Sequence, residues 1–267
     1  MSWSIGASTG ACINRPILEV LDAIRSAGIH GVELGTPPRH FNPWEHSQVH
    51  AVRERLVALE LAPIAIHAPF GSLLELSDPN VHHRNAALGA ILTSASALKQ
   101  LAGSIVVVHA TDVPREGQDV EQRLNCCVGS LSVLARACEQ MAVTLAVETP
   151  LPHLIGGQPD EFEWILERLD SSVRVCLDTS HTTLGQHWPR FVEMAGDRLV
   201  HVHANDHRGQ FDDHLPPGEG RINWKEIGES LRQLNYRGWL MLELSCPNLP
   251  LGEYFRRAHQ QLERLMA

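Results

Sequence analysis

Short apolar runs alternate with longer amphipathic segments along the chain. The runs are continuous rather than alternating in polarity, which is typical of strands in a parallel sheet that is covered on both faces. They predict eight strands, at residues 3–7, 32–35, 63–67, 104–109, 143–148, 173–178, 199–203 and 239–243.

The segments between the runs predict helices, because their apolar residues recur at helical spacing. We expect these helices at residues 17–27, 44–60, 80–101, 120–141, 159–169, 189–195, 224–234 and 251–266. Eight strand-then-helix units in 267 residues match a (β/α)8 barrel. The expected fold is therefore α/β, a single (β/α)8 TIM barrel over residues 1–267. A doubly wound open sheet is the alternative, but residues 6–10 lack the G-x-G-x-x-G turn that such sheets often carry.

Composition narrows the class of protein. The 22 basic and 31 acidic residues give a net charge of −9, which argues against broad binding to nucleic acid or anionic membranes. We expect neither a membrane span nor a secretory signal, because no apolar run reaches the required length and the first residues lack a basic region. The six cysteines form no C-x-x-C pair, which favours buried free thiols in the reducing cytoplasm.

Residues of metal-ligand type recur where the predicted strands end. The third to eighth strands end, in order, at His67, His109, Glu148, Asp178, His203 and Glu243. His181 lies three residues beyond the sixth strand, and the long irregular segment after the seventh carries Asp212 and His214. The carboxyl ends of all strands in a barrel meet at one mouth, so we expect these nine side chains to gather there.

This set combines imidazoles and carboxylates and contains no thiolate, which suits Zn²⁺, Mn²⁺, Co²⁺ or Fe²⁺ rather than Ca²⁺. The chain has 16 histidines, and imidazole is the commonest metal ligand in proteins. Any one of these residues alone would more simply be a hydrogen-bonded or rim residue. Several unpaired carboxylates at the ends of apolar strands would each cost several kcal/mol to desolvate, however, and a cation removes that cost. The joint pattern predicts a metal centre.

Two further residues are weaker candidates for substrate binding. Glu33 ends the second predicted strand, where it either binds substrate or forms a salt bridge on the rim. Arg208 follows the seventh strand, where it either anchors a carboxylate or phosphate or is simply solvated.

These motifs resemble the xylose isomerase-like TIM barrels, the superfamily that unites sugar isomerases and epimerases with endonuclease IV. The resemblance covers almost the whole chain and includes the segments 178–181, 203–206 and 212–220. For the isomerase and epimerase members it implies one divalent ion (Mn²⁺, Zn²⁺, Co²⁺ or Mg²⁺), held by the residues that match Glu148, Asp178, His203 and Glu243. For endonuclease IV it implies three Zn²⁺ held by nine residues, and all nine have a counterpart in the strand-end and loop residues named above.

Our main hypothesis is a metal-dependent isomerase or epimerase of a small sugar or sugar-like hydroxy-carbonyl compound. Glu148 and Glu243 would exchange the proton as base and acid through an enediolate, and His181 would donate a hydrogen bond to a substrate oxygen. The alternative is a zinc-dependent AP endonuclease, in which Arg39 or Phe70 would serve as the wedge that opens the duplex. A non-enzymatic metal-binding barrel is a third hypothesis, against which the complete ligand set argues.

Two features favour the sugar hypothesis over the nuclease. The net charge is poor for gripping a phosphate backbone, and only eight residues separate His203 from Asp212, fewer than the resembling endonucleases have. On the sugar side, residues 149–154 lack the second glutamate that ketose 3-epimerases tend to carry. The expected partner is a small sugar, not nucleic acid or a membrane, and the resemblance allows a homo-oligomer.

Overall fold

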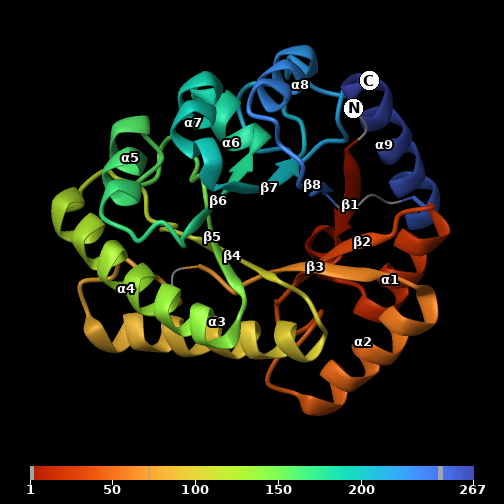
Figure 1. Ribbon diagram of the computed structural model, residues 1–267, viewed down its shortest axis with the longest axis horizontal. Coiled ribbons are helices and arrows are strands. Elements are labelled where there is room, and N and C mark those ends of the chain that lie inside the picture. Colours follow the sequence, from red (N-terminus) through yellow and green to blue (C-terminus); the bar gives the residue numbers. More distant parts are fainter. Residues whose placement is uncertain (1–2, 72, 246–248) are drawn as a thin grey trace.

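The computed structural model describes residues 3–71, 73–245 and 249–267. Its eight parallel strands close into one barrel in chain order (Figure 1), which confirms the predicted (β/α)8 fold and excludes an open sheet. The strands are β1 (Ser4–Ser8), β2 (Gly31–Gly35), β3 (Ala62–His67), β4 (Ile105–His109), β5 (Thr144–Glu148), β6 (Arg174–Asp178), β7 (Leu199–Ala204) and β8 (Trp239–Leu242).

Helices surround the barrel (Figure 1) and lie close to the predicted ranges. They are α1 (Ile17–Ser26), α2 (His46–Leu59), α3 (Val81–Gln100), α4 (Val120–Met141), α5 (Pro159–Glu167), α6 (Thr179–Leu184), α7 (Trp188–Ala195), α8 (Trp224–Gln233) and α9 (Leu251–Met266), with short 3₁₀ turns η1 (Thr9–Cys12) and η2 (Gly196–Arg198). Within the described ranges, none of them has the length and apolar character needed to cross a bilayer.

Helix α6 was not predicted, because its sequence Thr-Ser-His-Thr-Thr-Leu is rich in β-branched and polar residues with weak helix propensity. The helix begins because Asp178 caps it: the Asp178 carboxylate accepts a hydrogen bond from the backbone N–H of His181 at 2.9 Å. This cap also places the His181 side chain directly beside the end of β6.

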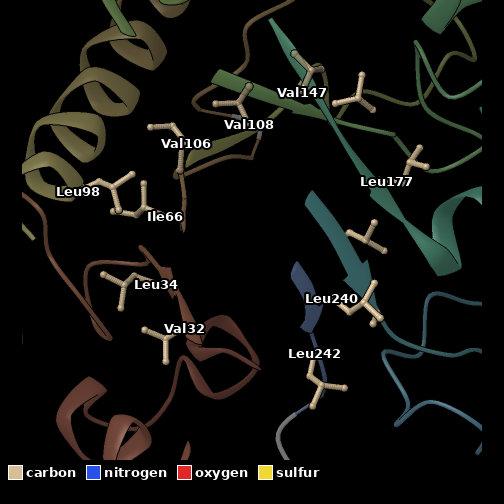
Figure 2. Packing of buried hydrophobic residues seen from close by; sticks show 14 of the residues in the cluster. Val32, Leu34, Ile66, Leu98, Val106, Val108, Val147, Leu177, Leu240 and Leu242 are labelled. Carbon is tan, nitrogen blue, oxygen red and sulfur yellow. The ribbon is translucent and has the colours of Figure 1, made fainter. Parts of the chain in front are cut away.

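Side chains along each strand alternate between the inside of the barrel and the helical layer. The outward residues pack against the helices, and Figure 2 shows part of this layer, including Val32 and Leu34 of β2 and Ile66 of β3 near Leu98 of α3. A separate inward cluster fills the barrel interior with Ala65, Val107, Ala146 and Cys176. The residues two positions further along these four strands point the same way, and they are His67, His109, Glu148 and Asp178. The strand period therefore aims the predicted ligands at the mouth.

The long loop between β7 and α8 is anchored by the fully buried carboxylate of Asp206. This carboxylate accepts four hydrogen bonds of 2.9–3.0 Å, from the indole N–H of Trp224 and from the backbone N–H groups of His207, Gly218 and Ile222. Gly220 packs so closely that a Cβ atom there would lie 2.2 Å from Asp206 Oδ1. The loop is therefore an ordered structure that holds a fixed path over the mouth.

Candidate metal centre

The structure gathers all nine predicted ligands at the carboxyl ends of the strands. They form three groups, and within each group one ligand atom per residue lies within 4.8 Å of the others. The groups are His67, His109 and Glu148; Glu148, Asp178, His203 and Glu243; and His181, Asp212 and His214. A fourth such group combines His203 with Glu33 and His201. Because Glu148 belongs to two groups, it is the central acid of the site.

The Glu148 carboxylate is almost completely buried and lies within hydrogen-bond distance of three imidazoles, with Nδ1 of His181 further away at 3.7 Å. Its Oε2 atom lies 3.1 Å from Nε2 of His67 and 3.1 Å from Nε2 of His109. Its Oε1 atom lies 3.0 Å from Nδ1 of His203. Glu243 approaches the same atom of His203, with Oε2 at 3.1 Å. Two carboxylates from separate strands therefore share one imidazole nitrogen.

Four histidines are held in place through Nδ1, so that Nε2 faces an acid of the site. Nδ1 of His67, His181 and His214 donates to the backbone carbonyls of residues 68, 149 and 243, at 2.8–3.1 Å. Nδ1 of His109 lies 2.6 Å from the Asp112 carboxylate. A metal-bound imidazole usually donates its second ring N–H to an oxygen in this manner. The anchoring leaves Nε2 available as a ligand.

His203 has the opposite orientation, and Glu33 is the cause. The Glu33 Oε2 atom accepts from Nε2 of His203 at 3.1 Å and from Nε2 of His201 at 3.0 Å, with all three residues fully buried. This contact turns Nδ1 of His203 toward Glu148 and Glu243. The site therefore presents five imidazole nitrogens to its carboxylates.

The structure places neither weak substrate-binding candidate in the mouth. Glu33 pairs with Ala65 in the β2–β3 register, whereas Gly35 pairs with His67, so Glu33 lies one inward layer below the mouth. Its complete burial also rules out the rim salt bridge. Arg208 points away, with 68% of its side chain exposed and its guanidinium 3.0 Å from Asp213. The strand register places Glu33 below the mouth and the path of the loop turns Arg208 into solvent; neither feature can be seen in the sequence.

Burial and the neighbouring charges together shift the pKa values of these groups. Burial alone would raise the pKa of Glu148, but the His203 and His109 imidazoles hold this pKa well below its ordinary value. Burial would lower the pKa of His203, yet the nearby acids, Glu243 and Glu148 among them, raise it well above its ordinary value. Burial raises the pKa of Asp178, and the other acids of the site add to that rise. Protonated imidazoles thus balance the carboxylates, a task that a divalent cation performs for all of them together.

The site opens into a cavity of about 250 Å³. Glu148, Glu243 and His181 line it, while Asp178 and His203 lie beneath, with no exposed surface. This volume is slightly below the roughly 300–1,000 Å³ typical of drug-sized ligands. Anchored imidazoles, clustered buried carboxylates and an adjoining cavity fit a divalent cation with a small polar substrate.

Several supporting residues were missed in the sequence. Asp112 anchors His109, and its own backbone N–H donates to the buried Glu75 carboxylate at 2.9 Å. The Thr36 hydroxyl donates to the backbone carbonyl of His67 at 2.7 Å. The Asn205 amide, which belongs to the segment 203–206 already noted in the sequence, donates to Asp178 at 2.7 Å. Asp112 has a local signal, because it follows His109 by three residues, but Glu75 and Thr36 have none.

Comparison with known proteins establishes the family. The family model described as "Xylose isomerase-like TIM barrel" matches residues 21–265. The chain belongs to this family. The sequence resemblance is thereby confirmed, and the fold explains why candidate ligands from six strands meet at one mouth.

Three individual relatives each share less than a third of their aligned residues with this chain. An uncharacterized protein of Methanocaldococcus jannaschii, MJ1311, is 29% identical over 188 residues, covering 67% of this chain and 64% of the relative, just under two thirds of its length. A D-psicose 3-epimerase of Enterocloster bolteae is 29% identical over 120 residues, covering 43% of this chain and 38% of the epimerase. The crystal structure of a D-tagatose 3-epimerase-like protein has a TM-score of 0.85 at 21% identity, covering 100% of this chain and 98% of that one.

Proposed function

We propose that the protein is a divalent-metal-dependent isomerase or epimerase of a small sugar or sugar-like hydroxy-carbonyl compound. The observation that carries this proposal is the convergence of Glu148, Asp178, His203 and Glu243 at the base of a small cavity. The similarity to a D-psicose 3-epimerase supports the same class of reaction. The buried free thiols Cys127, Cys138 and Cys176 fit a reducing cytoplasmic setting, which we include in the proposal.

The chain's own residues can perform the proton transfers that such a reaction needs. Glu148 ends β5 and Glu243 directly follows β8, three strands further round the barrel. Both line the cavity, so one can remove a proton beside the carbonyl while the other returns one. The substrate then passes through an enediolate. A bound divalent cation would stabilise the negative charge that develops on the substrate oxygens. His181, which also lines the cavity, would donate a hydrogen bond to a substrate oxygen.

The segment after β5, which forms one wall of the cavity, is compatible with both an isomerase and an epimerase reaction. Residues 149–154 contain no acidic residue. Instead Thr149, Pro150, Leu151 and Leu154 form an uncharged wall of the cavity. A second acid from this segment is therefore absent from the proposed mechanism, which relies on Glu148 and Glu243.

Solvent exchange tests the proposal. The protein is stripped with a chelator, supplied with one equivalent of Mn²⁺ or Co²⁺, and incubated in D₂O with a panel of ketoses that includes both free sugars and their ethers. Deuterium is expected at the carbon beside the carbonyl, as detected by NMR, and the metal-stripped protein should exchange none. Glu148→Gln should abolish exchange, whereas the matched control Glu253→Gln, on the exposed face of α9, should retain it. Exchange that survives in Glu148→Gln, or none with any ketose, would contradict the proposal.

A second candidate function rests on the grouping of the ligands. Nine ligands in three groups, with Glu148 shared by two, suit a cluster of three Zn²⁺ and hydrolysis of a phosphodiester at an abasic site. Metal analysis by mass spectrometry separates the two functions: one exchangeable ion per chain is expected for the sugar enzyme, and three tightly held Zn²⁺ together with cleavage of abasic DNA for the nuclease.

A further inference from the structure

A second and larger cavity adjoins the candidate metal centre. Its volume is about 660 Å³, compared with about 250 Å³ for the first. The two cavities share four lining residues, His67, Phe70, His214 and Glu243. A ligand that reaches the carboxylates therefore also borders the larger space. The reaction proposed above makes no use of that space, because the first cavity already contains both proton-transfer residues.

The walls of the larger cavity are mainly apolar. Apart from the shared residues, none of the described residues that line it is ionisable, and the apolar ones are Ile13, Pro37, Pro38, Ala68, Pro69, Leu74 and Leu244. Two of its hydroxyl groups are already engaged, since Ser8 accepts from the backbone N–H of Gly10 and Thr36 donates to the carbonyl of His67. Such walls do not suit a phosphate or a highly charged group, which would lose its hydration without compensation.

An exposed aromatic ring stands at the boundary of the two cavities. The Phe70 ring stacks on His109 with a centroid distance of 4.1 Å and an interplanar angle of 26°, yet 55% of the residue remains exposed. Ile13, across the larger cavity, is 40% exposed. Exposed apolar groups that border a cavity next to a polar reaction centre are typical of a ligand-binding surface.

We infer that the substrate is a carbonyl sugar that carries an apolar or aromatic substituent, such as a glycoside or another conjugate, rather than a free monosaccharide. The sugar occupies the smaller cavity, and the substituent lies in the larger one against Phe70 and Ile13. This inference rests on the proposed function for the position of the sugar. Burial of about 60–100 Å² of apolar substituent corresponds to roughly ten- to sixtyfold tighter binding.

Calorimetric binding tests this assignment on the Mn²⁺-loaded protein. The ligands are D-fructose, its 1-O-benzyl and 6-O-benzyl ethers, and benzyl alcohol. At least one ether is expected to bind ten times more tightly than D-fructose or benzyl alcohol. Ile13→Glu places a charge on the apolar wall and should reduce this preference to threefold or less, with D-fructose binding unchanged. Pro38→Glu, at another exposed wall position, should act in the same way.

The matched control is Val57→Glu, which places the same charge on the outer face of α2 and should leave the preference intact. Thermal melting confirms that each variant is folded. The inference is overturned if neither ether binds more tightly than D-fructose, or if the preference survives in both wall variants. Tight ether binding without any deuterium exchange would instead count against the proposed reaction while supporting the assignment of the cavity.

Discussion

Replacement of Glu33 by glutamine should weaken metal binding although it removes no ligand. The Glu33 carboxylate is fully buried and accepts the Nε2–H of His203 at 3.1 Å, which orients Nδ1 toward the site. A hydrogen bond to a charged group contributes about 1.5–3 kcal/mol, compared with about 0.5–1.5 kcal/mol for a neutral one. Glutamine keeps the shape and loses the charge, so the difference is about 1–2 kcal/mol, or roughly 5- to 30-fold in the dissociation constant. Outer-shell substitutions at metal sites commonly cost about 10- to 100-fold.

The assay is competition for Mn²⁺ or Co²⁺ against a chromophoric chelator, with Glu253→Gln as the exposed control. The Co²⁺ absorption spectrum supplies a second readout, because reorientation of His203 would change the ligand field. Glu33 Oε1 has no hydrogen-bond partner among the described residues, so the new amide N–H₂ would be buried unpaired and should also lower the stability of the metal-free protein. A folded Glu33→Gln protein whose dissociation constant stays within twofold of the wild type would refute this reasoning.

Two stability measurements test the electrostatics and the loop. Burial lowers the pKa of His181 and His214, but the neighbouring carboxylates raise these pKa values to about 9 and about 10. The stabilisation that these two protonated imidazoles give the folded protein is therefore complete below pH 6.5 and is lost as pH rises through 9 to 10. The melting temperature of the chelator-treated protein should fall between pH 6.5 and 10, and a constant or rising melting temperature would contradict the charge balance. Asp206→Asn should lower the free energy of unfolding by about 2–4 kcal/mol, because the asparagine NH₂ group cannot accept the hydrogen bonds that one carboxylate oxygen of Asp206 accepts from N–H donors. Urea denaturation measures this free energy, and a loss below about 1 kcal/mol would show that the loop has another anchor.

The sequence by itself determined the barrel and the place in it of most of the candidate ligands. Continuous apolar runs separated by amphipathic segments specify covered parallel strands, and the strand period alone aims His67, His109, Glu148 and Asp178 into the mouth. The apolar runs and the alternation along each strand are local patterns, so they can be recognised in the sequence without knowledge of the packing. Helix α6 is the local exception, because its sequence disfavours a helix and the cap supplied by Asp178 establishes it.

Only the tertiary structure decided how these residues cooperate. The register of β2 against β3 places Glu33 below the mouth, where it orients His203, instead of on the rim. The hydrogen bonds of Asp206 determine the path of the loop that brings Asp212 and His214 to His181. Partners such as Glu33 and His203 are separated by 170 positions in the chain. Such contacts depend on how strands and loops align in space, and no spacing within a single segment reveals them.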